Sequence, residues 1–368
     1  MNHSKNTIWY ILAISAVLHG LIIYFSIPFT NYDINSWYTG GKSTLEGINI
    51  YPMIATRTHP YFPLFLYLEA IALYFSTTFI PQIVILKIIF SLFNLGVVYL
   101  VYHFSKKNIF LTALYAFNPV SLLVTCFHGQ FDSIPVFLIL LSIFYVQKKK
   151  TTLPLLILST AIALKTWPIL FCIPIFKLMK KKLTIRFLSS SLLLLSIVPV
   201  ITTLIYVFFF HANPLMIAKV LISYGGVTTV WGLSKGTFLI LGNNKIVYFI
   251  LKIIFVALLL LFQWKNKDTS IFSQLYYAIV LFFVIASGFG IQYFYWIVPF
   301  ALLSKKSNWS IYLSILCSIV VTYMVFAGIK IPPIAYESVY FMTWILLALH
   351  FLDYIMSPFL NMRSYRRT

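Results

Sequence analysis

Long apolar stretches follow one another along almost the whole chain, and no other feature restricts the possible fold so strongly. Of the 368 residues, 61% are hydrophobic and only 9% are charged. Within a bilayer every backbone N–H and C=O group needs a partner inside the protein, and a helix supplies these partners along its own length. The sequence therefore predicts an all-α, polytopic integral membrane protein, with residues 1–368 forming a single transmembrane domain.

The formal net charge of +20 comes from basic residues that lie in short clusters between the apolar stretches. A nucleic-acid-binding face would gather such residues on one soluble surface, whereas the positive-inside rule explains short clusters as the cytoplasmic ends of membrane spans. The clusters lie at residues 106–107, 148–150, 177–186, 265–267, 305–306 and 363–367. Membrane lipids are therefore expected partners, and nucleic acid is not.

The placement of residues 61–79 sets the predicted topology. This segment is apolar, but counting it as a span would move the basic clusters from residue 106 to residue 306 to the outer side. We therefore predict an interfacial helix here, in the first extracytoplasmic loop, with both termini cytoplasmic. About 12 transmembrane helices are then expected, at residues 8–27, 82–104, 109–127, 133–147, 152–164, 167–179, 187–210, 243–263, 271–287, 291–304, 309–328 and 339–357.

This topology predicts two long outer loops, residues 28–81 and 211–242, and a short outer turn at residues 128–132. One pair of helices is too short to span the bilayer. Residues 152–165 would form a helix of about 21 Å at 1.5 Å per residue, against a hydrocarbon core of about 30 Å. Lys165 should therefore lie at membrane depth, where a charge requires a partner such as a lipid phosphate. The alternative is a lysine that extends to the interface.

Polar residues that suit catalysis occur in the first outer loop. Asp33 follows the first predicted helix and precedes Trp37 and Tyr38, and Arg57 and His59 lead into the interfacial segment. An isolated aspartate just beyond a helix is most simply explained as the N-cap of the next helix. A carboxylate at the membrane surface is also a candidate general base, and the second outer loop favours that interpretation.

The sequence FHGQFDSIP places His128, Gln130 and Asp132 within five residues between two apolar stretches. An ordinary solvated turn has little need for these three side chains together, although Asp132 could cap the following helix. Two potential metal ligands, His128 and Asp132, give a weak metal signal. Farther on, Gln292, Tyr293 and Trp296 follow a glycine-rich outer turn. An interfacial aromatic belt explains the tyrosine and the tryptophan but not Gln292.

These segments, taken in order, resemble the GT-C superfamily of membrane glycosyltransferases, which use polyprenyl- or dolichyl-phosphate-linked sugars. YDINSWY at residues 32–38 is similar to the start of the family's first outer loop, and residues 47–52 match its GxxxYP motif. HGQFD at residues 128–132 resembles the second outer loop of the dolichol-dependent glucosyl- and mannosyltransferases. LKTWPILFCIPI at residues 164–175 and GIQYFYWIVP at residues 290–299 resemble segments of the GPI mannosyltransferase I catalytic subunits.

The resemblance implies single displacement with inversion, with a sugar moving from a polyprenyl-phosphate-linked donor and with mannose favoured. Asp33 would be the catalytic base, and Lys165 with Arg57 would contact the donor phosphate. The expected substrate-binding residues are Trp37, Tyr38, His59, His128, Gln130, Asp132, Trp167, Gln292, Tyr293 and Trp296. Some relatives carry a DxD-like pair where this chain has Asp33-Ile34-Asn35. No cofactor is firmly implied, and whether a divalent cation binds stays open.

A separate argument agrees with the resemblance. A site on the outer face cannot use cytoplasmic nucleotide sugars, so the donor sugar should be carried across the membrane on a lipid. The acceptor could be a glycolipid, a glycan or a protein, and the expected location is the plasma membrane of a prokaryote. The main alternative is a secondary transporter, because intramembrane charges and broken helices also mark substrate pathways. A lipid-linked oligosaccharide ligase or polymerase and a non-catalytic partner subunit are further alternatives.

Overall fold

The part of the chain that the computed structural model describes comprises residues 3–52, 59–180, 183–223, 231–242, 244–286, 288–306 and 308–365. Every regular element in these ranges is a helix, which confirms the predicted all-α class. The chain divides into two compact units, Met1–Tyr224 and Gly225–Thr368, and each is described by itself. The single functional domain stays a prediction.

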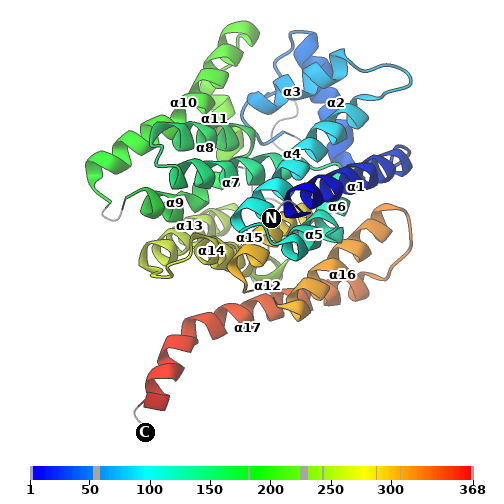
Figure 1. The fold of residues 1–368 in the computed structure, drawn as a ribbon. Helices are drawn as coiled ribbons and strands as arrows, with labels where there is room; N and C mark the ends of the chain where they lie inside the picture. Colours follow the sequence, from blue (N-terminus) through cyan, green and yellow to red (C-terminus); the bar gives the residue numbers. More distant parts are fainter. Residues whose placement is uncertain are drawn as a thin grey trace. The chain divides into compact units, whose positions relative to one another are not determined.

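The first unit carries the predicted active-site loops. In this unit α4 packs against α1 and α7, and α8 packs between α7 and α10 (Figure 1). Its elements are α1 (His3–Phe25), α2 (Tyr32–Leu45), α3 (Leu64–Tyr74), α4 (Gln82–Phe104), α5 (Ile109–Ala116), α6 (Pro119–Leu122), the π-helical turn η1 (Leu123–His128), α7 (Ser133–Gln147), α8 (Thr152–Leu164), the 3₁₀ turn η2 (Trp167–Phe171), α9 (Cys172–Met179), α10 (Ile185–Phe210) and α11 (Pro214–Ser223).

The second unit is also helical. In it α14 packs against α15 and α17, and α16 packs against α17. Its elements are α12 (Gly232–Leu241), α13 (Lys245–Lys265), α14 (Ile271–Ile285), the 3₁₀ turn η3 (Ile291–Tyr293), α15 (Phe294–Ser304), α16 (Trp309–Phe326) and α17 (Pro333–Tyr365).

Long apolar helices support the assignment to the membrane. Within the described residues, seven helices are long and apolar enough to cross a bilayer: Asn6–Phe25, Gln82–Phe104, Ile109–His128, Ile185–Phe210, Ile246–Lys265, Trp309–Phe326 and Pro333–Ser357. The other predicted spans are present as shorter apolar helices, such as α7 and α14. The protein is therefore an integral membrane protein by composition and helix length, and the count of 12 crossings stays a prediction.

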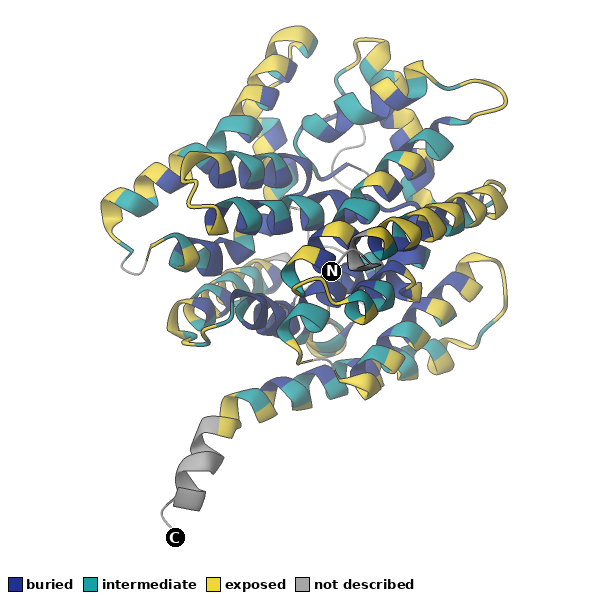
Figure 2. Cartoon of the chain, in the orientation of Figure 1, coloured by how far each residue is buried: buried dark blue, intermediate teal, exposed yellow. Residues whose placement is uncertain are grey.

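The outward faces of the long helices are apolar. Trp9 and Val17 of α1 and Leu193 and Phe208 of α10 are exposed, and Figure 2 shows exposed residues along one side of each helix. Exposed apolar rows of this kind would be unfavourable in water and suit a lipid environment.

The predicted span 109–127 is not one continuous α-helix. Asn118 accepts hydrogen bonds from the backbone N–H groups of Val120 and Ser121, and Pro119 follows it at the first position of α6. This N-cap and proline begin a new helix after α5 ends. The new helix then widens into the π-turn η1, which ends at Gly129 with a φ of 82°. Such π-helical turns often occur at functional sites.

Helix α8 is as short as the sequence predicts. It contains 13 residues, which correspond to about 20 Å, and the backbone of Lys165 is already extended. The chain then turns through η2, which contains Pro168, into the eight-residue helix α9. The early turn confirms the predicted break at Lys165 and leaves this lysine inside the first unit.

Candidate active site

Helix α2 begins directly beside Asp33. Asn31 is the N-cap, and its side-chain oxygen accepts a hydrogen bond from the backbone N–H of Ile34 at 2.9 Å. Asp33 therefore lies in the first turn and is not the cap, so the capping alternative is wrong for this residue. A carboxylate in the first turn is stabilised by the helix dipole, and its side chain is free of the capping bond.

Trp37, one turn after Asp33, holds α2 in place. Its ring is only 2% exposed and packs edge-on against Phe65, Phe90 and Phe131. Phe65 and Phe131 stack with their ring centres 3.8 Å apart. Each aromatic pair contributes about 0.5–1.5 kcal/mol beyond the burial of its area. The aromatic core therefore joins α2 to the turn that contains Phe131, and Trp37 does not present a free face to a sugar.

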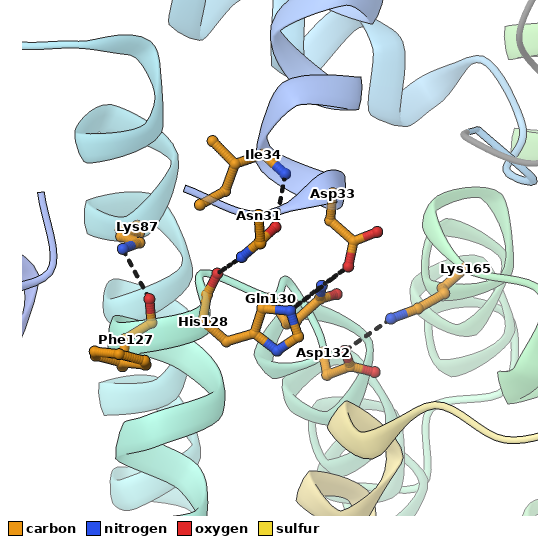
Figure 3. Close-up of polar contacts among 9 residues, drawn as sticks. All are labelled: Asn31, Asp33, Ile34, Lys87, Phe127, His128, Gln130, Asp132 and Lys165. Carbon is orange, nitrogen blue, oxygen red and sulfur yellow. Dashed lines mark hydrogen bonds and ion pairs between the residues drawn. The ribbon is translucent and has the colours of Figure 1, made fainter. Parts of the chain in front are cut away.

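The turn at residues 128–132 lies against the start of α2. The side-chain amide of Asn31 donates a hydrogen bond to the carbonyl oxygen of His128 at 3.2 Å. The Nε2 atom of Gln130 donates to Oδ2 of Asp33 at 2.5 Å, and Nε2 of His128 lies 3.6 Å from the same oxygen (Figure 3). The structure thus brings His128 and Gln130 against Asp33, which lies about 100 positions earlier in the sequence.

Asp33 remains open to a substrate. Its side chain is 38% exposed, whereas that of His128 is 4% exposed. Both contacts involve Oδ2, and Figure 3 shows the other carboxylate oxygen pointing away from Gln130. One oxygen is therefore oriented by the protein, while the other points away from these two contacts.

The surroundings of Asp33 also control its charge. Burial acts to raise the pKa of its carboxyl group, but the hydrogen bond and charge of His128, the charge of Lys165 and the hydrogen bond from Gln130 outweigh burial. The pKa of Asp33 is therefore lowered from its ordinary value of 3.8. The carboxylate is ionised at neutral pH, which is the form that a general base requires.

Asp132 and Lys165 form a buried ion pair on the other side of the turn. The Nζ atom of Lys165 donates to Oδ2 of Asp132 at 2.7 Å, and the two side chains are 6% and 0% exposed (Figure 3). Asp132 stands at the N-cap position of α7, as the capping alternative expected, but its side chain makes no capping bond there. Lys165 also lies over the ring of Phe131, with Nζ 4.5 Å from the ring centre. The lysine is held inside the protein and does not extend to the interface.

Tyr38 lines a cavity whose lining includes Ile34, the residue after Asp33, but not Asp33 itself. The cavity has a volume of about 310 Å³ and lies between α2, the end of α3 and the start of α4. It is lined by Ile34, Asn35, Tyr38, Leu73, Ser76, Thr77, Pro81, Gln82 and Ile83. An aromatic ring together with amide and hydroxyl groups is a suitable lining for a polar ligand with apolar faces.

His59 contacts a residue that the sequence motifs did not single out. It is 1% exposed, and its Nε2 atom lies 3.4 Å from Oε1 of the fully buried Glu69 in α3. Burial raises the pKa of Glu69 to about 7, and His59 opposes this increase. Glu69 was detectable in the sequence as an acid within an apolar helix, which is a costly placement.

The remaining predicted residues belong to other elements of the first unit, to the second unit, or to the part of the chain outside the described residues. Trp167 is buried in η2, two residues after Lys165. Gln292, Tyr293 and Trp296 belong to the second unit, where the rings of Tyr293 and Trp296 stack with centres 4.4 Å apart. Arg57 lies outside the described residues.

Among the residues that the structure does describe, no three His, Cys, Asp or Glu side chains are grouped so that they could hold a metal ion.

Two comparisons with known proteins agree with the motifs. The family described as Mannosyltransferase (PIG-M) matches residues 124–226, which include His128, Gln130, Asp132 and Lys165. GPI mannosyltransferase 1 of Saccharomyces cerevisiae is 26% identical to this chain over 157 residues. The aligned part covers 41% of this chain and 37% of the yeast protein.

These matches confirm the resemblance to GT-C glycosyltransferases, and in particular to GPI mannosyltransferase 1. They support a membrane-embedded glycosyltransferase enzyme and do not favour a transporter. Asp33 lies before the matched family segment, so its role depends on the geometry described above.

Proposed function

We propose that this protein transfers mannose from a polyprenyl-phosphate-linked donor to an acceptor on the extracytoplasmic face of the membrane, with inversion at the anomeric carbon. One observation carries the proposal: an ionised, partly exposed carboxylate, Asp33, and a buried cation, Lys165, flank the same polar turn. Inverting sugar transfer requires a base for the acceptor hydroxyl and a positive group for the departing phosphate. The similarity to mannosyltransferases supports the choice of sugar.

Asp33 acts as the general base. The oxygen that does not contact Gln130 removes the proton from the acceptor hydroxyl while that hydroxyl oxygen forms a bond to the anomeric carbon of mannose. The C–O bond to the lipid phosphate breaks on the opposite face, and the lipid phosphate leaves with the electron pair. His128 and Gln130 fix the carboxylate through Oδ2, so the base is oriented before the substrates bind.

Lys165 stabilises the charge that develops on the departing phosphate, together with Arg57. An ammonium group has three N–H donors, so the contact with Asp132 does not exclude a phosphate oxygen. Asp132 then keeps the lysine oriented in its buried position. We assign Asp132 this orienting role because its carboxylate is fully buried and cannot reach an acceptor directly.

Gln130 and Tyr38 are the strongest candidates for sugar contacts. The Oε1 atom of Gln130 is buried and accepts no hydrogen bond from the residues that the structure describes. A buried unpaired acceptor costs about 1–3 kcal/mol, and a sugar hydroxyl would satisfy it. The cavity lined by Tyr38 suits the acceptor, which we take to be a glycolipid. We assign no direct sugar contact to the other predicted substrate-binding residues, which have a positioning role or no assigned role: His59, Trp37, Trp167, Gln292, Tyr293 and Trp296.

A donor panel tests the proposed function. The purified full-length protein is incubated with polyprenyl-phosphate mannose, polyprenyl-phosphate glucose or GDP-mannose, and the release of free polyprenyl phosphate or GDP is measured. We expect release from the polyprenyl-phosphate mannose, faster than from the glucose donor, and none from GDP-mannose. Release of GDP from GDP-mannose would contradict the proposal that the donor sugar is linked to a lipid. Sugar uptake into proteoliposomes without donor cleavage would instead establish the transporter.

A further inference from the structure

Lys87 is a buried lysine whose role the motifs do not explain. It lies in α4, one of the helices long enough to span the membrane, and is 1% exposed. Its Nζ atom donates hydrogen bonds to the carbonyl oxygen of Phe127 at 2.9 Å and to Oγ of Ser26 at 2.8 Å (Figure 3 shows the first contact). Among the described residues it forms no ion pair with a carboxylate.

A lysine in this setting is costly. Placing a charged lysine at membrane depth costs roughly 2.5–3.5 kcal/mol on insertion scales. Leucine or methionine would fill the same space without that cost. The residue is therefore expected to contribute something that an apolar side chain cannot, and its contacts indicate what that is.

The contacts of Lys87 belong to a set that holds the end of the π-turn η1. Ser26 shares its hydroxyl proton between the carbonyl oxygens of Ile23 at 3.0 Å and Cys126 at 3.1 Å, Lys87 donates to that of Phe127, and Asn31 donates to that of His128 at 3.2 Å. Carbonyl groups at the end of a helix lack partners within the helix and carry its partial negative charge. Three consecutive carbonyls are thus held by three different side chains, and the cation takes the central one.

The stem of Lys87 also packs against the next residue of the turn. Gly129 has a φ of 82°, and a Cβ atom placed on it would lie only 2.8 Å from Cε of Lys87. The lysine therefore contacts the turn on both sides of His128: its charge binds the carbonyl before this residue, and its stem limits the residue after it. His128 and Gln130 are the two side chains that contact Asp33.

We propose that Lys87 is a positioning residue that fixes the turn from Phe127 to Gln130 and thereby holds His128 and Gln130 against Asp33. The consequence for catalysis rests on the proposed function, whereas the structural part does not. Lys87 acts through the geometry of the turn, because the groups that change the pKa of Asp33 are His128, Lys165 and Gln130.

The test compares Lys87→Met with a control on the same face of α4. Asn94 is seven residues later, is fully buried, and contacts His19 and Tyr115 at 2.8 Å each, away from the turn. Lys87→Met and Asn94→Leu both remove a buried polar group from α4. Both are expected to lower the thermal stability of the detergent-solubilised protein, so stability alone does not separate them.

Kinetics separate the two variants. A displacement of about 1 Å at a catalytic group can cost about 100-fold in rate. We expect Lys87→Met to lower kcat about 10- to 100-fold with little change in KM, and Asn94→Leu to leave kcat near that of the wild type. Loss of the His128 and Gln130 contacts removes part of what lowers the pKa of Asp33 and leaves the charge of Lys165, so the acid limb of kcat/KM should move to higher pH in Lys87→Met alone.

Hydrogen exchange supplies a measurement that is independent of activity. In Lys87→Met the peptide covering residues 123–132 should take up deuterium faster, with no change over residues 309–326, and Asn94→Leu should leave the first peptide unchanged. Equal effects of the two variants on exchange and on the pH profile would overturn the proposal. If Lys87→Met does not fold, Ser26→Ala removes one of the two Lys87 contacts together with the bond from Ser26 to the carbonyl of Cys126, and it should give the same changes in smaller degree. If the wild type transfers no sugar but the variants still show these exchange differences, the proposed function is wrong and the positioning role of Lys87 is supported.

Discussion

The two acids of the site differ in their surroundings. Asp33 is partly exposed, contacts His128 and Gln130 through one oxygen, and has a lowered pKa. Asp132 is fully buried and bound to Lys165. Two carboxylates held in such different environments suit two different roles, since one can reach a substrate while the other can act only through its partner. Neither role can be inferred from the residue types alone.

The ion pair between Lys165 and Asp132 leads to a prediction about stability. Replacing Lys165 with Met leaves Asp132 buried without its partner, which typically costs about 3–5 kcal/mol. Without the structure, Lys165→Met would be expected to leave the fold intact. We now expect a marked loss of thermal stability, and recovery of most of it in Lys165→Met/Asp132→Asn.

Donor binding separates the stabilising role of this pair from its proposed contact with the phosphate. The double variant should fold but bind the polyprenyl-phosphate donor at least tenfold more weakly than Asp132→Asn alone, as measured by equilibrium binding in detergent. If the double variant binds the donor as tightly as Asp132→Asn alone does, Lys165 does not contact the donor phosphate.

The residues of the site were predictable to the extent that they form local groups of unusual polarity. His128, Gln130 and Asp132 stand together in the sequence, and their contact with Asp33 agrees with the predicted sidedness. Lys87 and Glu69 were missed as single charges within apolar helices, although such charges are rare enough to draw attention. The pairing of Lys165 with Asp132 could not be predicted, because it depends on how α7 and α8 pack.

At the scale of the elements, helix α2 approaches α3 at two glycines. A Cβ atom on Gly40 would lie only 2.3 Å from Oε2 of Glu69, and one on Gly41 would lie 2.8 Å from the backbone oxygen of Glu69. Gln82 donates to that same backbone oxygen at 2.8 Å. The helix that carries Asp33 therefore rests directly on Glu69, and the protonation of this residue affects how firmly α2 is held.

Glu69 should make the stability of the protein depend on pH. Its pKa is about 7 in the folded protein against an ordinary value of 4.5, so between these pH values the folded state holds a proton that the unfolded state has released. Stability should therefore fall as pH rises through this window, by at most about 1.4 kcal/mol per pH unit. Thermal unfolding of Glu69→Gln should show this dependence reduced.

Glu46 offers the matched control for this measurement. It is an acid in the same predicted outer loop, its side chain is 48% exposed, and it forms an ion pair with Lys42 at 3.9 Å. Glu46→Gln should leave the pH dependence of unfolding unchanged. A wild-type stability that rises between pH 4.5 and 7, or equal curves for wild type and Glu69→Gln, would contradict the assignment.

The existence of the helices followed from the apolar pattern, whereas their internal breaks did not. The predicted span 109–127 contains an N-cap and a π-turn because Asn118 and Pro119 restart the helix within an apolar run. Apolar composition cannot detect such a break, since the residues on both sides of it are equally apolar. The π-turn that follows this restart is important because side chains bind the carbonyl groups at its end, next to the active-site turn.

At the scale of the whole molecule, the predicted topology can be tested by labelling. In a variant without Cys126, Cys172 and Cys317, single cysteines are introduced at Tyr32 and at Lys149, both of which are exposed. A membrane-impermeant maleimide applied to intact cells should label the cysteine at position 32 and not that at position 149, because the basic clusters are expected to be cytoplasmic. Permeabilised cells provide the control. External labelling at position 149 would reverse the sidedness and exclude an extracytoplasmic donor site.

The central claim is that Asp33 is the base of a mannosyl transfer, and its most direct test compares two nearly isosteric variants. Transfer from polyprenyl-phosphate mannose is measured for Asp33→Asn and Asp132→Asn, with donor binding measured in parallel. Removing a positioned general base typically costs about 10²- to 10⁴-fold in rate. We expect Asp33→Asn to lose transfer by this amount while still binding the donor. Asp132→Asn, whose amide oxygen can still accept a hydrogen bond from Lys165, should retain turnover with weaker binding. Near-normal transfer by Asp33→Asn would contradict the account.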